Sequence, residues 1–214
     1  MSVTSNNDSR PETTDTPMLL DVNTPSVQTW KPDMTEATHN FHVGVSPIAG
    51  VGKALYASKF IAKGSYILTF CGPLVNEDEA DERDLANFGR GMGNELQIGH
   101  DFYVYLEEPG RLINHSCEPN AGIKNDTVLT AIKDIPKGDQ IFFDYSTTMD
   151  EGDWAMACLC GESNCRGAAA DFKRLPTETR AKYLQLGVVQ RFIAKQFDAH
   201  TGELLCQPAH KKED

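Results

Sequence analysis

The sequence predicts a mostly β protein with some α-helix, made of several small sheets and ending in C-terminal helices. Three observations predict this fold class. Short apolar runs alternate with turn residues from Phe41 to Asp144, an acidic segment carries helix-start signals, and apolar residues recur at helical spacing after Pro176. This combination indicates an α+β protein whose strands are too short for one large sheet.

Six runs are predicted strands because each is short, apolar and bounded by Gly, Pro, Asn or Asp. They are Phe41–Val45, Ala54–Ala57, Tyr66–Phe70, Phe102–Leu106, Val128–Ile132 and Gln140–Asp144. The segments Ile61–Ile67 and Ile135–Ile141 share the form Ile-x-Lys-Gly-x-x-Ile. Each predicts a Lys-Gly turn that leads into a strand, with glycine adopting positive φ. The similarity of the two segments is explained equally well by recurring turn chemistry and by a closer structural relation between them.

Two segments are predicted helices. In Asn76–Phe88, Asn76 can cap the helix, Glu79 follows three residues later, and acids fill the first turn. The stretch Pro176–Phe197 reads as helix interrupted at Gly187. Its approximate apolar face should dock on the core of the protein; it consists of Leu184, Val188, Phe192 and Ile193.

Composition and charge limit the classes of function. The net charge is −11, from 20 Lys+Arg against 31 Asp+Glu, which argues against nonspecific nucleic-acid binding because that needs a basic surface. An acidic protein suits a basic partner such as a lysine-rich peptide, although charge alone fits simple solubility better. No run approaches the roughly eighteen apolar residues of a membrane helix, and the N-terminus lacks the pattern of a secretory signal. We therefore expect an intracellular protein without membrane contact.

Six cysteines form an uneven pattern that predicts a structural zinc site. Three of them have the spacing C-x-C-x4-C: Cys158, Cys160 and Cys165. Structural zinc takes four ligands, and Cys117, in a second polar loop, is the natural fourth. Cys71 follows an apolar run and suits a buried core thiol, whereas Cys206 lies in a polar tail. An unrelated zinc knuckle is the alternative for the triplet taken alone.

A second conspicuous motif runs from Gly110 to Asn120 and contains Asn114-His115-Ser116-Cys117. Amide and imidazole groups can pair with the donor and acceptor edge of a heterocycle. Taken alone, His115 could instead be a metal ligand or, more commonly, a buried core histidine. Downstream, Gly138–Tyr145 reads as a strand that ends in a phenol.

These motifs together resemble the SET-domain lysine methyltransferases. The resemblance rests on Asn114–Asn120 (Asn-His-Ser-Cys-x-Pro-Asn), Phe143–Tyr145 (Phe-Asp-Tyr) and Cys158–Gly167, which resembles the post-SET segment, in the order of the family. Gly50–Ala57 resembles the Gly-x-Gly loop of the family. The resemblance covers roughly residues 40 to 170, and it implies a SET β-clip fold with a knot-like core.

The resemblance also implies roles for residues in S-adenosylmethionine-dependent methyl transfer to lysine. Tyr145 would stand where a lysine channel meets the methyl sulfonium, and Phe143 would occupy the aromatic position that sets how many methyl groups are added. Cys117, Cys158, Cys160 and Cys165 would share one structural zinc. The residues expected to hold the cofactor are Gly50, Val51, Gly52, Lys53, Arg111, Asn114, His115, Tyr145 and Leu159. A second channel tyrosine, Tyr103 or Tyr105, is left open.

The expected organisation is a disordered or loosely ordered leader at 1–37, a SET domain at 38–148, a post-SET segment at 149–170 and a helical extension and tail at 171–214. The expected partner is a lysine-containing protein or peptide, possibly a histone, with no direct nucleic-acid binding; the oligomeric state is open. A noncatalytic SET-fold module that binds peptide or cofactor is the alternative function. The location would be the nucleus or chromatin in a eukaryote and the cytoplasm in a bacterium.

Overall fold

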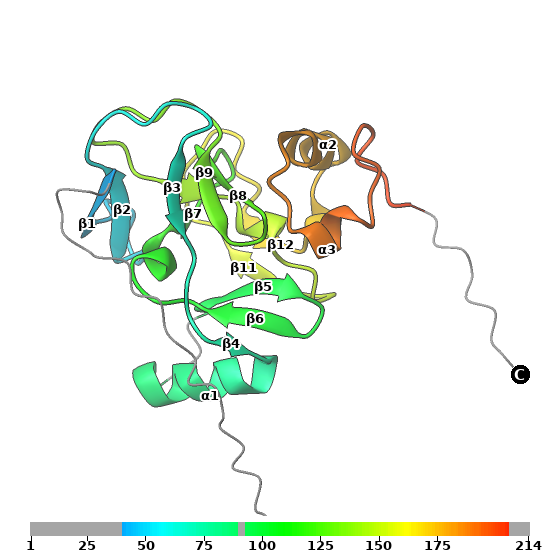
Figure 1. The fold of residues 1–214 in the computed structure, drawn as a ribbon, viewed down its shortest axis with the longest axis horizontal. Helices are drawn as coiled ribbons and strands as arrows, with labels where there is room; N and C mark the ends of the chain where they lie inside the picture. The colour runs from blue at the N-terminus through cyan, green and yellow to red at the C-terminus, as the bar shows by residue number, and fades with distance from the viewer. Residues whose placement is uncertain (1–39, 90–92, 206–214) are drawn as a thin grey trace, which may run out of the picture. The chain divides into compact units, whose positions relative to one another are not determined.

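A computed structural model describes residues 40–89 and 93–205. Within these residues the strands are short, and their order along the chain is interrupted by three α-helices (Figure 1). The strands are β1 (Phe41–Val45), β2 (Lys53–Ala57), β3 (Tyr66–Thr69), β4 (Leu74–Val75), β5 (Glu95–Gly99), β6 (Phe102–Tyr105), β7 (Asn114–His115), β8 (Ala121–Lys124), β9 (Val128–Ala131), β10 (Phe142–Phe143), β11 (Ala155–Ala157) and β12 (Ala168–Ala170). The helices are α1 (Glu77–Phe88), α2 (Thr177–Leu186) and α3 (Arg191–Ala194).

The described strands form small sheets, as the sequence predicted. Antiparallel pairs join β1 to β2 and β11 to β12, while two three-stranded antiparallel sheets have the orders β3-β9-β8 and β4-β6-β5. The pair β7 and β10 is parallel, and it brings together segments nearly thirty residues apart in the sequence. The predicted fold class, mostly β with some helix, is therefore confirmed for the described residues.

Helix α1 begins where the sequence predicted. The Asn76 side chain accepts a hydrogen bond from the Glu79 backbone at 2.9 Å, and the Glu79 carboxylate accepts one from the Asn76 backbone at 3.1 Å. This reciprocal pair satisfies two helix-end donors. The helix ends at Gly89, whose left-handed φ of 70° is open to glycine. α1 lies next to the β4-β6-β5 sheet, with Ala80 packed near Tyr103 (Figure 1).

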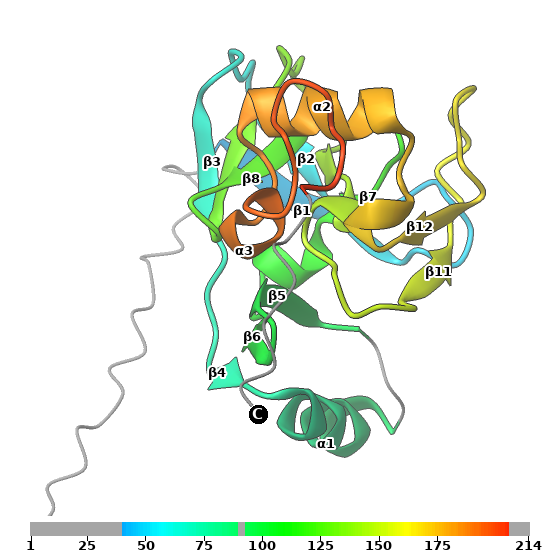
Figure 2. The ribbon, with the colours of Figure 1, turned by 90° about the vertical axis from the view of Figure 1, so that its right-hand side faces the viewer.

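The main core contains the inward side chains of β2, β3, β8 and β9 together with Ile113, Ile141 and Phe143. A second cluster joins the C-terminal helices to the rest of the described chain through Phe172, Tyr183 and other apolar side chains. α2 lies at the opposite end from α1 in both ribbon views (Figure 2). The predicted docking face is present: Val188 and Ile193 are buried, and Leu184 and Phe192 pack against them.

The structure refines several predicted boundaries. The helical stretch after Pro176 divides at Gly187 into α2 and α3, as expected. The two Lys-Gly turns have φ values of 87° and 92° at Gly64 and Gly138, and Ile61 pairs with Ile135 in an antiparallel bridge. The predicted strand Gln140–Asp144 is too long, because only Phe142–Phe143 pairs as β10.

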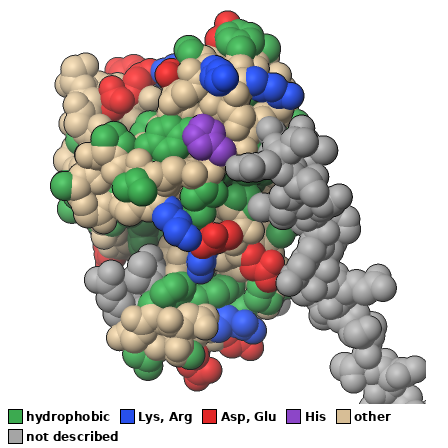
Figure 3. Space-filling view, turned by 90° about the vertical axis from the view of Figure 1, so that its left-hand side faces the viewer, with side chains coloured by type: hydrophobic (Ala, Val, Ile, Leu, Met, Phe, Trp, Pro, Cys, Tyr) green, Lys and Arg blue, Asp and Glu red, His purple; other side chains and the backbone are tan. Residues whose placement is uncertain are grey.

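Other findings concern the surface and the ends of the chain. On the face drawn in Figure 3, acidic and basic side chains lie side by side between apolar areas. Among the described residues, no helix has both the length and the apolar character to cross a membrane. The predicted leader at 1–37 and Cys206 lie outside the described residues.

Candidate active site and cysteine cluster

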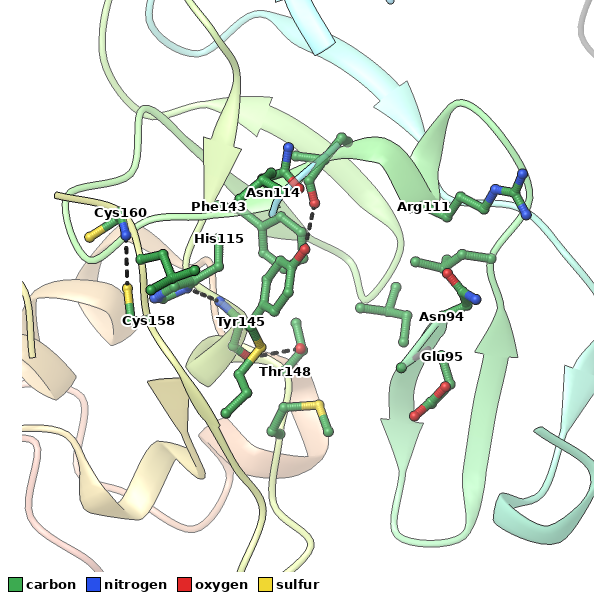
Figure 4. Close-up of a pocket in the computed structure, with 18 of the residues that line it drawn as sticks. Asn94, Glu95, Arg111, Asn114, His115, Phe143, Tyr145, Thr148, Cys158 and Cys160 are labelled. Atoms are coloured by element: carbon green, nitrogen blue, oxygen red, sulfur yellow. Dashed lines mark hydrogen bonds between the residues drawn. The ribbon is translucent and has the colours of Figure 1, made fainter. Parts of the chain in front are cut away.

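The site forms where β7 and β10 run side by side. Phe142 pairs with Asn114, and Phe143 pairs with His115. The pairing places the amide and imidazole of one motif beside the aromatic end of the other (Figure 4). Just after β10 the chain turns into a 3-10 helix that starts at Tyr145. The sequence motifs that lie apart along the chain thus meet at one place.

A cavity of about 500 Å³ lies where β7 and β10 pair, a place called the β7–β10 crossing below. It is large enough for a drug-sized or nucleoside-sized ligand. Its wall includes seven of the nine predicted cofactor residues, Gly50, Val51, Arg111, Asn114, His115, Tyr145 and Leu159, together with Phe143. Gly52 and Lys53 are not among the residues that line it. The cavity also reaches the cysteine segment at Cys158 and Cys160.

Tyr145 is fixed in the wall of the cavity by two hydrogen bonds. Its hydroxyl donates to the Ile113 carbonyl oxygen at 2.8 Å, and its backbone N–H donates to His115 Nδ1 at 3.2 Å. Burial raises the pKa of Tyr145 well above its ordinary value. The phenol is therefore neutral at physiological pH, and its oxygen can accept a hydrogen bond from a ligand.

Phe143 packs against Tyr145 with a ring separation of 4.8 Å and against Phe70 with one of 5.7 Å. The predicted strand that ends in the phenol of Tyr145 instead ends at Phe143, although the two rings remain neighbours. Phe143 is only 4% exposed and lines the cavity. A larger side chain at this position would therefore take space from a ligand.

His115 is a neutral imidazole in this site. Burial lowers its pKa to about 4, an effect that Asp144 opposes and Arg166 reinforces. Because the ring is neutral, Nδ1 can accept the hydrogen bond from the Tyr145 N–H. His115 Nε2 lies 3.5 Å from Cys117 Sγ. His115 therefore lies between the phenol and the cysteine cluster.

Asn114 ties the Gly-x-Gly loop to the crossing. Its amide Nδ2 donates to the Lys53 carbonyl oxygen at 3.1 Å. Gly50 and Gly52 have φ values of 84° and 79°, a region that other residues adopt at a cost, so the loop needs both glycines. Lys53 lies outside the cavity with its side chain near Glu108, at 3.5 Å. The Lys53 backbone, rather than its ammonium, connects it to the site.

Asp144 lies behind Tyr145 and links three parts of the chain. Its Oδ1 accepts from Arg166 at 2.8 Å, and its Oδ2 accepts from the Tyr183 hydroxyl of α2 at 3.0 Å. Both Asp144 and Tyr183 are almost fully buried. The contact with Arg166 connects this carboxylate to the cysteine segment, and the contact with Tyr183 connects it to the C-terminal helices.

The four predicted metal ligands come together. The sulfur atoms of Cys117, Cys158, Cys160 and Cys165 all lie within 4.8 Å of one another, and the Cys117 and Cys158 sulfurs are 3.7 Å apart. A tetrahedral zinc with bonds of about 2.3 Å would separate its ligands by roughly 3.8 Å. The cluster is therefore compatible with a zinc site.

The surroundings of the sulfurs also suit metal binding. Backbone N–H groups donate to Cys158 from Cys160, to Cys117 from Arg166 and to Cys165 from Gly167, each at 3.4 Å. Such donors favour the thiolate form that zinc requires. Burial raises the pKa of the Cys117 and Cys158 thiols despite these donors, whereas at Cys160 hydrogen bonds from the backbone and neighbouring thiols outweigh burial and bring the pKa to about 7.

The structure corrects the expectation for a second channel tyrosine. Neither Tyr103 nor Tyr105 lines the cavity, because both pack under α1. The Tyr103 hydroxyl donates to Glu151 at 3.0 Å, and the Tyr105 hydroxyl donates to Asp84 at 2.9 Å. Tyr103 and Tyr105 are two residues apart on β6, so their side chains lie on the same face of the strand. The sequence alone could not show whether that face borders the cavity.

Several cavity residues were missed by sequence reasoning. They come from the loop after β1, from the start of β5, from the end of β6 and from the segment that runs from the 3-10 helix after β10 to β11: Ile48, Asn94, Glu95, Leu96, Leu106, Thr148, Met149, Trp154, Met156 and Ala157. A tryptophan and two methionines just before a cysteine triplet were the available signal. The strand β5 gave none, because its sequence Glu-Leu-Gln-Ile-Gly is mixed in polarity.

Comparison with known proteins matches residues 52–146 to the model of the SET domain family. Over 143 residues, the chain is 27% identical to human histone-lysine N-methyltransferase 2D, covering 62% of this chain and 2% of that protein. It is 33% identical over 138 residues to a histone-lysine N-methyltransferase, H3 lysine-4 specific, of Schizosaccharomyces pombe, covering 59% of this chain and 15% of that protein. The chain thus spans a small fraction of these relatives.

Among solved structures, the polycomb repressive complex 2 of Chaetomium thermophilum matches at 25% identity and a TM-score of 0.44, covering 50% of this chain and 15% of that chain. This TM-score is too low to bear on the site. The match at 52–146 contains Asn114, His115 and Tyr145, together with the cavity residues of β5. Residues 52–146 of this chain form a SET domain homologous to those of histone-lysine methyltransferases.

Proposed function

We propose that this chain transfers a methyl group from S-adenosylmethionine to the side-chain amine of a lysine in a protein. The observation that carries the proposal is the cavity at the β7–β10 crossing, where Tyr145, Asn114 and His115 line one wall and the cysteine segment lines another. An amide, a neutral imidazole and a neutral phenol beside an apolar wall suit a ligand with both a heterocycle and an alkyl chain.

The proposed cofactor supplies an electrophilic methyl on a sulfonium sulfur. The chain would contribute alignment and a desolvated path for the amine. A free lysine has a pKa of about 10.4, so only about a thousandth is neutral near pH 7.4. An apolar cavity favours the neutral amine, and holding it in line with the methyl lowers the barrier by several kcal/mol.

Tyr145 would orient the amine through its oxygen. Its own proton is already donated to the Ile113 carbonyl oxygen, which leaves the lone pairs of the phenol directed toward a donor such as an amine. Its raised pKa argues against a phenolate that takes a proton. We therefore assign Tyr145 to positioning of the amine and Phe143 to the shape of the space beside it.

The four cysteines would hold one structural zinc. Four thiolates leave no open coordination position, so the metal would not take part in the chemistry. Its role would be to fix Ala157–Cys160, which form part of the cavity wall. Arg166 next to Cys165 would extend this fixation to Asp144 through their 2.8 Å contact.

The proposed boundaries remain 38–148 for the SET domain, 149–170 for the post-SET segment and 171–214 for the C-terminal extension, after a leader at 1–37. The relatives carry names of histone-lysine methyltransferases, which supports a histone as substrate and chromatin as location. The net charge of −11 suits a basic substrate.

The test is methyl transfer from labelled S-adenosylmethionine to purified core histones and to other basic proteins. The wild-type protein should label a lysine, and Tyr145→Phe should reduce the rate far more than it reduces the affinity for S-adenosylhomocysteine. A protein that binds cofactor or peptide but labels none of these substrates would support the noncatalytic alternative. Full turnover in Tyr145→Phe would remove Tyr145 from the mechanism.

A further inference from the structure

A carboxylate with no role in the mechanism above lies in the cavity wall. Glu95 is the first residue of β5, and Figure 4 shows it across the cavity from Tyr145. Glu95 pairs with Tyr105 of β6, and its two chain neighbours, Asn94 and Leu96, also line the cavity.

A second carboxylate, Glu151, is held on the same side by a set of hydrogen bonds. The Gln97 side-chain oxygen accepts from the Asp150 backbone at 2.8 Å, which fixes the loop after Met149 against β5. Glu151 Oε1 accepts from the Tyr103 hydroxyl at 3.0 Å, and the Glu151 backbone donates to Asp171 at 3.0 Å. These contacts fix negative charge close to Glu95.

The electrostatic surroundings of Glu95 are negative. Burial, assisted by Asp84, Glu151 and Asp81, raises its pKa to about 7, although a hydrogen bond from its own backbone opposes the shift. The groups that face Glu95 are the acids of α1, Glu151 from the loop after Met149, and the tyrosines of β6. In the described part of the chain, no Lys or Arg forms an ion pair with Glu95. A cation in the cavity would relieve this repulsion.

We propose that Glu95 receives the cationic ammonium group of the target lysine when it enters the cavity. The inference rests on the proposed function and specifies how that site recognises its substrate. A lysine is protonated in water, and bringing its charge into a partly apolar cavity without a partner is costly. Glu95 offsets this cost on the wall across from Tyr145.

The test measures binding of an acetylated and amidated peptide that contains one lysine and no histidine, in the presence of S-adenosylhomocysteine, by calorimetry. Between pH 8 and pH 6 the ionised fraction of a group with a pKa of about 7 falls about tenfold. Peptide affinity should fall about fivefold in the wild-type protein, because the protonated form should bind about as weakly as Glu95→Gln. Glu95→Gln should bind about tenfold more weakly at pH 8 and lose the pH dependence. Glu82→Gln removes one exposed charge from α1 outside the cavity. This variant should keep the wild-type peptide affinity at pH 8 and the wild-type pH dependence.

Two results would overturn the role of Glu95: wild-type affinity in Glu95→Gln at pH 8, or an equal loss in Glu82→Gln. A wild-type protein that binds no peptide at pH 8 would overturn it as well. Methyl transfer from labelled cofactor is measured on the same samples. Binding that depends on Glu95 without any transfer would refute the proposed enzyme activity and leave the recognition site intact. Methyl transfer together with peptide binding that does not depend on Glu95 would support the proposed enzyme activity and refute the role of Glu95 in recognition.

Discussion

Replacing Tyr183 by Phe should destabilise the protein and slow methyl transfer, although Tyr183 lies outside the SET domain match and does not line the cavity. The Tyr183 hydroxyl donates to Asp144 Oδ2 at 3.0 Å, and both residues are at most 2% exposed. Without this donor, a buried carboxylate oxygen loses its hydrogen-bonding partner. Because Asp144 directly precedes Tyr145, a shift of Asp144 should also displace Tyr145, the residue that would orient the amine.

The size of the effect follows from the chemistry of the lost contact. A hydrogen bond to a charged, buried acceptor contributes about 2–3 kcal/mol when its donor alone is removed. A domain of this size loses about 2 kcal/mol of unfolding free energy per molar urea. The urea midpoint of Tyr183→Phe should therefore fall by about 1 M with an unchanged slope.

The assay compares urea unfolding of wild type, Tyr183→Phe and Tyr66→Phe, all saturated with zinc. Tyr66 is 54% exposed, and its hydroxyl hydrogen-bonds Thr69 at 3.2 Å, so the same atom is deleted at the surface. That variant should stay within about 0.5 kcal/mol of wild type. If Tyr183→Phe unfolds at the wild-type urea concentration, then Asp144 does not depend on α2, and the proposed coupling is wrong. A rate that falls while affinity for S-adenosylhomocysteine holds would distinguish positioning of Tyr145 from general loosening of the cavity.

Three further outcomes are expected. Purified protein should contain about one equivalent of zinc by elemental analysis, and Cys158→Ser should lose it together with much of its stability; a metal-free protein with full activity would contradict this. Asn114→Ala should weaken cofactor binding by about 1–3 kcal/mol, because the Lys53 carbonyl oxygen and the cofactor both lose an amide partner; wild-type affinity in calorimetry would remove Asn114 from the site. Phe143→Tyr should shift products toward monomethyl-lysine in mass spectra, and a wild-type enzyme that stops at one methyl would refute the role of Phe143.

The sequence predicted best those elements whose local chemistry agrees with the fold. The strand Phe41–Val45 and the cap at Asn76 were predicted at their observed positions, because apolar runs and capping residues act locally. β7 was missed, since Asn114–His115 has no strand-forming character and pairs only because β10 lies beside it. β11 and β12 were missed for the same reason, since both are rich in alanine.

The site was predictable where the chain encodes it in contiguous motifs and unpredictable where it depends on which face of a strand is covered. The four cysteines were identified by spacing and by a second polar loop, and their sulfurs do converge. Tyr103 and Tyr105 were chosen for residue type, but α1 covers their face of β6. Glu95 carried no signal, because a single acid in a strand gains meaning only from the cavity beside it.

Glu95 should make the folded protein less stable at high pH, which gives its role a test independent of any substrate. Its pKa rises from an ordinary 4.5 to about 7 on folding, so any stability from this group is complete below pH 4.5 and is lost as the pH rises through 7. The shift corresponds to about 3 kcal/mol if fully expressed, and solvent screening of a partly exposed group reduces this to about 1–2 kcal/mol. Glu95→Gln should therefore unfold at higher urea than wild type at pH 8 but at a similar concentration at pH 5. Equal urea midpoints of wild type and Glu95→Gln at pH 8 would show that the ionised Glu95 carboxylate does not destabilise the folded protein. A higher midpoint together with weaker peptide binding would mark Glu95 as a residue that serves recognition at the expense of stability, as functional sites commonly do.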